Sequence, residues 1–233
     1  YHGGQIFYIF TQGWDIKAFP FYLVLSIITG FYSLYVLKSI SYSANVLDGI
    51  KNPYKKALIG GIALGGVIFL LPPLYGEGYH TVQMLLNSDY TRLFDSGLLF
   101  KFHDSKYALL FITIAILLIK IFATQLTMSA GGNGGFFAPS LFMGSMIGFF
   151  FVYSVNYFDI GKIMGIDKLN EPNFIAVAMA GLMSGVMHTP LTAIFLIAEA
   201  TGGYTLLVPL MIVSSLSFLI SKYFHPQSIY QKH

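Results

Sequence analysis

The most informative segment of the chain runs Ser129-Ala130-Gly131-Gly132-Asn133-Gly134-Gly135-Phe136-Phe137-Ala138-Pro139. Glycine is used where main-chain N–H groups must approach another group closely. An apolar stretch opens at Phe136 and continues to Phe158, so we expect these amides at a helix N-terminus, which carries about half a positive charge. Such an end attracts anions. Taken alone, the segment is consistent with an anion-binding loop and also with a plain turn between two membrane helices.

The composition of the chain is that of a membrane protein. Its 233 residues are 55% hydrophobic and only 10% charged, and its mean hydropathy is +0.68. This leaves too little polar surface to coat a soluble domain of this size. Basic residues exceed acidic ones by only 13 to 10, which does not suggest a nucleic-acid partner. We therefore expect a multi-pass integral membrane protein with the lipid bilayer as its surroundings.

Apolar runs divide the chain into segments of unequal length. They cover residues 19–37, 57–71, 107–119, 136–158, 174–187, 190–198 and 204–224. A straight span needs about 20 residues, so the first, fourth and last runs can cross a bilayer, while the others are short unless polar flanks extend them. Short helices must end inside protein or at water, because each unsatisfied backbone group in lipid costs several kcal/mol. Broken helices of this kind are typical of channels and transporters.

Several helix ends are marked in the sequence. Thr189-Pro190 predicts a new helix that starts with a capping hydroxyl and a proline, and Thr201-Gly202-Gly203 predicts its end. Gly60-Gly61 and Gly65-Gly66 predict a small-residue face that another helix can approach closely. The polar segment 87–106 is predicted to be an extramembrane loop that contains a short helix.

The chain offers few chemically active groups, and each has an ordinary interpretation. Glu77-Gly78-Tyr79-His80 has the spacing of a carboxylate-bridged metal site but lacks a second copy. Glu199 is expected at the membrane interface or in a local pair, and His188 is expected to hydrogen-bond locally. Lys120 is expected to meet carbonyls at a helix C-terminus or to snorkel, with anion attraction as the alternative. Tyr230 reads as an interfacial aromatic residue.

No motif for catalysis or for a metal cofactor is present. We find no His-Glu-x-x-His, Gly-x-Ser-x-Gly or Walker sequence. The chain also has no cysteine, which excludes disulfides and thiol ligands. We therefore expect neither an enzyme nor a bound cofactor.

Three pieces of the chain resemble the CLC chloride channel and transporter family, in the order that the family has them. They are GGFFAPSLFMG at residues 134–144, AGLMSGVMHTPLTA at 180–193 and SIY at 228–230, and LPPLYGEGY at 71–79 resembles a family loop as well. The likeness covers nearly the whole chain. It implies an all-α integral membrane fold of tilted and broken helices, the CLC-type fold. Residues 1–233 would form the C-terminal half of its membrane domain, roughly helices J to R and the second inverted repeat only. Within these residues we see no cytoplasmic domain.

The resemblance also implies a mechanism and a site. In this family chloride is held by main-chain amides at helix N-termini and by serine and tyrosine hydroxyls. By position, the amides of Phe136 and Phe137 match the anion-contacting pair, Gly134 and Gly135 belong to the anion loop, and Tyr230 matches the tyrosine. Partial dipole charges hold a monovalent anion without the deep Coulomb well of a buried cation, so the ion can leave. The function implied is that of a chloride channel or chloride/proton antiporter, with chloride as the transported ligand.

The likeness extends to assembly. The helices near Pro190–Ala200 and Leu206–Phe218 resemble those that line the family's homodimer interface, which gives Leu191, Ile194, Phe195 and Ile197 a packing role.

The family's gating and proton-transfer glutamates lie in its other half, and neither Glu77 nor Glu199 matches them. The choice between channel and antiporter is therefore open, and we do not expect this piece alone to conduct. The chain begins at Tyr1 rather than Met, which suggests a piece of a longer protein. Two other hypotheses remain: a non-transporting membrane scaffold or assembly fragment, and a cation-coupled transporter. The scarcity of acidic residues within the apolar runs disfavours the latter.

Overall fold

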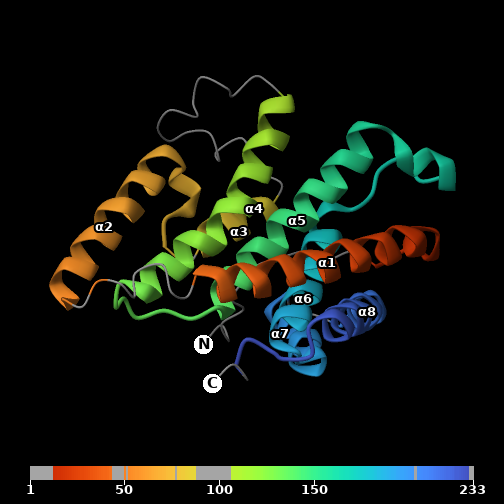
Figure 1. Ribbon diagram of the computed structural model, residues 1–233. Coiled ribbons are helices and arrows are strands. Elements are labelled where there is room, and N and C mark those ends of the chain that lie inside the picture. Colours follow the sequence, from red (N-terminus) through yellow and green to blue (C-terminus); the bar gives the residue numbers. More distant parts are fainter. Residues whose placement is uncertain are drawn as a thin grey trace, which may run out of the picture.

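The computed structural model describes residues 13–43, 50, 52–76, 78–87, 106–201 and 204–230. This part of the chain is helical and contains no strand. Figure 1 shows the helices in chain order: α1 (Phe19–Ser43), α2 (Pro53–Leu70), α3 (Tyr79–Leu86), α4 (Lys106–Ser129), α5 (Phe137–Tyr157), α6 (Glu171–Met187), α7 (Pro190–Ala200) and α8 (Leu207–Phe224). Short 3-10 turns lie at η1 (Ile16–Ala18), η2 (Pro72–Leu74) and η5 (Ile160–Met164). The predicted extramembrane loop, apart from Asn87 and Lys106 at its ends, lies outside the described residues, as do Glu77 and Gly202-Gly203.

In the described part of the chain, five helical segments are long and apolar enough to cross a membrane. They are Ile16–Tyr42, Pro53–Leu70, Leu109–Ser129, Phe137–Tyr157 and Leu207–Phe224. Two of these helices, α2 and α4, are longer than the apolar runs that predict them, because each helix includes polar residues next to its run. In α2 the Asn52 side chain caps the first turn, and in α4 the Thr124 and Thr127 hydroxyls donate to carbonyls four residues earlier. The Asn52, Thr124 and Thr127 side chains therefore pair with the backbone of the helices that they extend.

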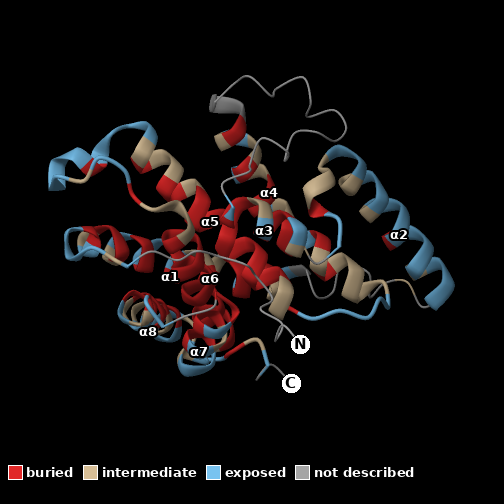
Figure 2. Ribbon diagram, turned by 180° about the vertical axis from the view of Figure 1, so that it is seen from behind, coloured by how far each residue is buried: buried red, intermediate tan, exposed pale blue. Residues whose placement is uncertain are grey.

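Helix α6 forms the centre of the fold. It packs against α1, α5, α7 and α8, and Figure 2 shows it buried beneath its neighbours. Glycines let the helices approach: a Cβ on Gly144 or Gly148 of α5 would lie 2.6 Å from the Cα of Met179 or Ile175 in α6. On the other side of α6, a Cβ on Gly185 would lie 2.7 Å from Ser33 in α1. The backbones of α5 and α6 are therefore in near contact.

The predicted small-residue face of α2 is mostly uncovered in the described part of the chain, although Gly60 is buried and α2 contacts α4 and η2. A Cβ on Gly61, Gly65 or Gly66 would meet no described atom within 4 Å, and most of α2 is exposed (Figure 2). Glycine spacing gives the same signal whether the helix face meets another helix or not.

The break between α6 and α7 lies where the sequence predicts it. Helix α6 ends at Met187, and His188 has the left-handed φ of 57° while its N–H donates to the Ser184 carbonyl. Helix α7 begins at Pro190. The predicted hydroxyl cap is wrong: Thr189 has ψ of 69°, outside the extended region in which a cap side chain reaches the first-turn amides, and makes no side-chain cap bond.

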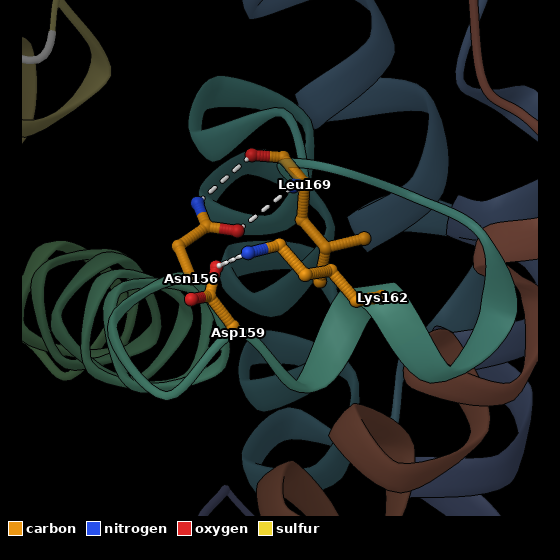
Figure 3. A network of polar contacts seen from close by, with 4 residues as sticks. All are labelled: Asn156, Asp159, Lys162 and Leu169. Atoms are coloured by element: carbon orange, nitrogen blue, oxygen red, sulfur yellow. Dashed lines mark hydrogen bonds and ion pairs between the residues drawn. The ribbon is translucent and has the colours of Figure 1, made fainter.

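The connection from α5 to α6 is tied back by one asparagine. Figure 3 shows Asn156 near the end of α5 bonded twice to the main chain of Leu169. Its Nδ2 donates to the Leu169 carbonyl at 3.1 Å, and the Leu169 N–H donates to its Oδ1 at 2.8 Å. The ion pair between Lys162 and Asp159, 3.0 Å long, is more than half exposed. The asparagine is therefore the stronger anchor of this loop.

Candidate anion site

The first two glycines of the loop between α4 and α5 end helix α4. Gly131 has a left-handed φ of 91°. Its N–H donates to the Met128 carbonyl at 3.1 Å, and the Gly132 N–H donates to the Thr127 carbonyl at 2.9 Å. This pair of bonds is the Schellman pattern of a helix C-terminus. The plain-turn interpretation is therefore correct for Gly131 and Gly132.

The last two glycines have no such local role. A Cβ on Gly135 would meet nothing within 4 Å among the described residues, and one on Gly134 would meet only Met128 Cγ at 3.7 Å. Neither residue has a left-handed φ, and both are exposed. Gly134 and Gly135 therefore leave the backbone open to a group outside the described residues.

The start of α5 presents main-chain donors that are unpaired among the described residues. Phe136 is the N-cap and makes no side-chain cap bond, and its carbonyl accepts the N–H of Ser140 at 3.0 Å. The N–H groups of Phe136, Phe137 and Ala138 make no hydrogen bond in the described part of the chain, and Pro139 has none to give. The Phe136 ring is buried at 9% exposed and anchors the loop in the core.

The Ala138 amide was not among the predicted site residues. The signal for it was Pro139: because proline cannot donate, the open donors of this helix end are confined to the residues just before it.

A cavity of about 490 Å³ lies beside this helix end. It is bordered by α2, η2, α4 and the glycine loop, and Gly134, Gly135 and Phe137 are among its lining residues. On its α4 side stands Lys120, whose side chain is only 3% exposed.

Lys120 meets carbonyls at a helix end, as the sequence predicts. Its Nζ donates to the carbonyls of Leu74, the last residue of η2, at 3.0 Å, and of Gly76 at 2.9 Å. The ammonium also lies 4.8 Å from the centre of the Phe142 ring, a cation–π distance. Lys120 thereby ties the segment after α2 to the middle of α4.

The remaining candidate residues lie apart from this cavity. His188 has its Nε2 3.4 Å from Ser221 Oγ, which agrees with the predicted local hydrogen bond. Glu199 is exposed near the end of α7. His80 is exposed, and no group of three potential metal ligands occurs within the described ranges.

Tyr230 lies in the terminal turn after α8 and is 62% exposed. Its hydroxyl makes no hydrogen bond to the described residues, and it does not line the cavity. Its contact with an anion stays a prediction.

The predicted packing residues of α7 fall into two groups. Leu191 and Phe195 are 70% and 55% exposed, whereas Ile194 and Ile197 are 3% and 0% exposed. The prediction of a dimer-packing role for Ile194 and Ile197 is therefore wrong, because they face the core of their own chain. Exposed apolar side chains therefore remain on α7, and α8 also exposes Val208 and Met211.

Comparisons with known proteins agree with this architecture. A voltage-gated ClC-type chloride channel, ClcB, of Escherichia coli is 30% identical over 186 residues, which are 78% of this chain and 38% of that protein. An H(+)/Cl(-) exchange transporter, ClcA, of Vibrio vulnificus is 29% identical over 206 residues, 86% of this chain and 39% of that protein.

Solved structures have the same fold. A slow cyanobacterial Cl-/H+ antiporter aligns with a TM-score of 0.74 at 18% identity, and a CLC-type fluoride/proton antiporter with 0.71 at 23% identity. Each alignment covers 98% of this chain but only 49% or 50% of the solved chain. The chain therefore spans well under half of the curated relatives and about half of the solved structures.

The sequence profile described as voltage gated chloride channel matches residues 1–222. In the described residues the architecture is helical, and five apolar helices are long enough to span a bilayer. Together with these features, the match identifies the chain as an integral membrane protein of the CLC voltage-gated chloride channel family.

Proposed function

We propose that this chain supplies one wall of a chloride pathway, and that the anion is held there by the main-chain amides at the start of α5. The observation that carries the proposal is the set of unpaired N–H groups at Phe136, Phe137 and Ala138. These residues directly follow Gly134 and Gly135 in the sequence. Neither a close contact with a described residue nor a left-handed φ requires a glycine at those two positions. The chloride channel and exchanger named among the relatives support chloride as the ion.

The chemistry of this helix end suits a transported ion. Amide dipoles carry partial charges, so a chloride that loses part of its water is compensated without being trapped. Glycine has no Cβ, so an anion or an opposing segment can approach Gly134 and Gly135 without a steric penalty. The same donors left unpaired in a low-dielectric site would destabilise the protein, so a ligand or an opposing polar group is expected there.

The proposed pathway also needs protein segments that this chain does not contain. The chain spans 38% or 39% of the two curated relatives, so transport is proposed for the full-length product of the gene and not for these residues alone. We further propose that the Tyr230 hydroxyl contacts the same anion from a second side. The support is its match to the family tyrosine and its exposed position.

We also propose a homodimer that packs through the outward face of α7 and α8. Its support is the row of exposed apolar side chains that includes Leu191, Phe195, Val208 and Met211. In a bilayer, helices associate through side-chain packing rather than through a hydrophobic driving force, so the shape of this face determines the strength of the dimer.

Chloride efflux tests the proposed function. The full-length protein is reconstituted in liposomes loaded with chloride, and efflux is followed with an ion-selective electrode after the membrane potential is clamped. We expect chloride to leave at a rate proportional to protein content, with protein-free liposomes as the control. A folded, reconstituted protein that releases no chloride would contradict the proposal and would favour the membrane scaffold.

A further inference from the structure

Lys120 carries a charge where the fold alone needs only hydrogen-bond donors. It lies near the middle of the candidate span Leu109–Ser129 and is 3% exposed. A cation at membrane depth is costly, and such residues usually mark ion pathways. No carboxylate among the described residues lies within ion-pair distance of it. Among the described residues, its charge is therefore compensated only by two carbonyl dipoles and one aromatic ring.

The ammonium has capacity for a further partner. A lysine carries three N–H donors, and the carbonyls of Leu74 and Gly76 take two of them. Lys120 lines the cavity of about 490 Å³, and no acidic side chain stands among the described lining residues. Thr124, Thr127 and Asn133 provide polar atoms on the same walls. Among the described residues that line the cavity, Lys120 is therefore the one charged group, and its charge is positive.

The size of the cavity indicates how an anion would occupy it. The cavity, at about 490 Å³, is many times larger than the roughly 30 Å³ that one water molecule takes up in the liquid. A single halide is far smaller than this space, so it would enter with much of its hydration shell. The lining continues to Gly134, Gly135 and Phe137, so a hydrated ion beside Lys120 would be adjacent to the open amides of α5.

We propose that this cavity is a second anion station, in which the Lys120 ammonium holds a partly hydrated halide next to the amide wall. This inference rests on the proposed chloride pathway and adds to it a site built on a side-chain charge. The two carbonyls that already bind Nζ weaken its attraction for an anion, which lets the ion exchange with the amides rather than remain trapped. Lys120 thus concentrates the anion and also positions the segment after α2.

Two substitutions separate these roles. Lys120→Gln removes the charge and offers two N–H donors from an amide that is one bond nearer the backbone. An unchanged unfolding midpoint shows that the tie to Leu74 and Gly76 is kept. Lys120→Arg keeps the charge. A residue that only ties the segment would tolerate glutamine, whereas an anion station would not.

Bromide is the probe, because it replaces chloride and can be located by anomalous diffraction from crystals of the full-length protein. We expect a bromide peak within about 4 Å of Nζ in the parent, a peak in Lys120→Arg, and none in Lys120→Gln. In liposomes the glutamine variant should need a roughly tenfold higher chloride concentration for half-maximal flux, with an unchanged unfolding midpoint. No bromide at Lys120 in the parent, or an equal peak in Lys120→Gln, would overturn the station.

The bromide experiment and the chloride efflux experiment can fail independently, so the Lys120 site and the proposed function are tested separately. If the parent conducts chloride but lacks the bromide peak, the station is wrong and the proposed function stands. If the parent binds bromide at Lys120 but releases no chloride, the proposed pathway fails while the anion site remains.

Discussion

At the scale of single residues, the glycine run contains two kinds of glycine. Gly131 adopts a left-handed φ of 91° at the end of α4, which is a backbone requirement. Gly135 has no left-handed φ, and a Cβ placed on it would meet no described atom within 4 Å. The described fold therefore does not explain why this residue lacks a side chain. The sequence places all of them in one motif and cannot separate these roles.

Alanine at each of these two glycines should separate stability from transport. Gly131→Ala should destabilise the protein by about 1–2 kcal/mol, because alanine is strained in the left-handed region. Gly135→Ala should change stability by less than about 0.5 kcal/mol and still lower chloride flux, because its methyl group obstructs the open backbone. Thermal unfolding in detergent and liposome efflux measure the two effects. Normal flux in a folded Gly135→Ala protein would show that nothing approaches this glycine closely.

Asn156 is the residue on which the α5–α6 connection most depends. Replacing it with alanine removes both bonds to the Leu169 main chain and should cost about 1–3 kcal/mol of stability. Asp159→Asn is the matched control, because its ion pair with Lys162 is more than half exposed and should matter by less than about 1 kcal/mol. The two unfolding midpoints compare them directly. Equal losses in both variants would mean that the asparagine is not the anchor.

At the scale of elements, the apolar runs predict where helices lie but not which faces meet. The helix starts at Phe137 and Pro190 agree with the sequence to within a residue, because proline and the glycine run mark them locally. The close approach of α5 to α6 at Gly144 and Gly148 was not predicted. A glycine inside an apolar run gives no local sign of its partner: Gly61, Gly65 and Gly66 of α2 look equivalent, yet a Cβ on any of them would meet no described atom within 4 Å.

Alanine substitution distinguishes these two kinds of helix glycine. In Gly148→Ala the new methyl group would lie 2.6 Å from the Ile175 Cα, which only a backbone shift can relieve, so a loss of about 1–3 kcal/mol is expected. Gly61→Ala has open space and should be neutral or stabilising by up to about 1 kcal/mol through helix propensity. Unfolding midpoints of the two variants provide the comparison. A harmless Gly148→Ala would mean that α5 and α6 are not in backbone contact.

At the scale of the whole molecule, the proposed dimer face can be tested without disturbing the core. Phe195→Ala removes a ring that is 55% exposed on α7, and we expect a larger monomer fraction in detergent because packing area is lost. Phe111→Ala is the control, since its ring is 73% exposed but lies on α4. Light scattering coupled to size exclusion measures the oligomer. A monomer fraction that rises equally in both variants would remove the specific role of the α7 face.

Only part of the candidate anion site could be predicted from the sequence. The loop and its helix start follow from adjacent residues, so they could be predicted. The Lys120 cavity could not, because it depends on carbonyls 44 and 46 residues away in the chain. The division of α7 into a buried face with Ile194 and Ile197 and an exposed face with Leu191 and Phe195 likewise appears only when α6 and α8 are in place.

The central claim is that the amides at the start of α5 hold chloride, and calorimetric titration of chloride into the full-length protein tests it most directly. Phe137→Pro deletes one of these N–H groups, while Phe137→Leu changes the side chain and keeps the amide. We predict that the leucine variant binds chloride like the parent and that the proline variant binds at least about tenfold more weakly, with both proteins folded by circular dichroism. Equal chloride affinity in the folded proline variant would contradict the claim and remove this amide from the site.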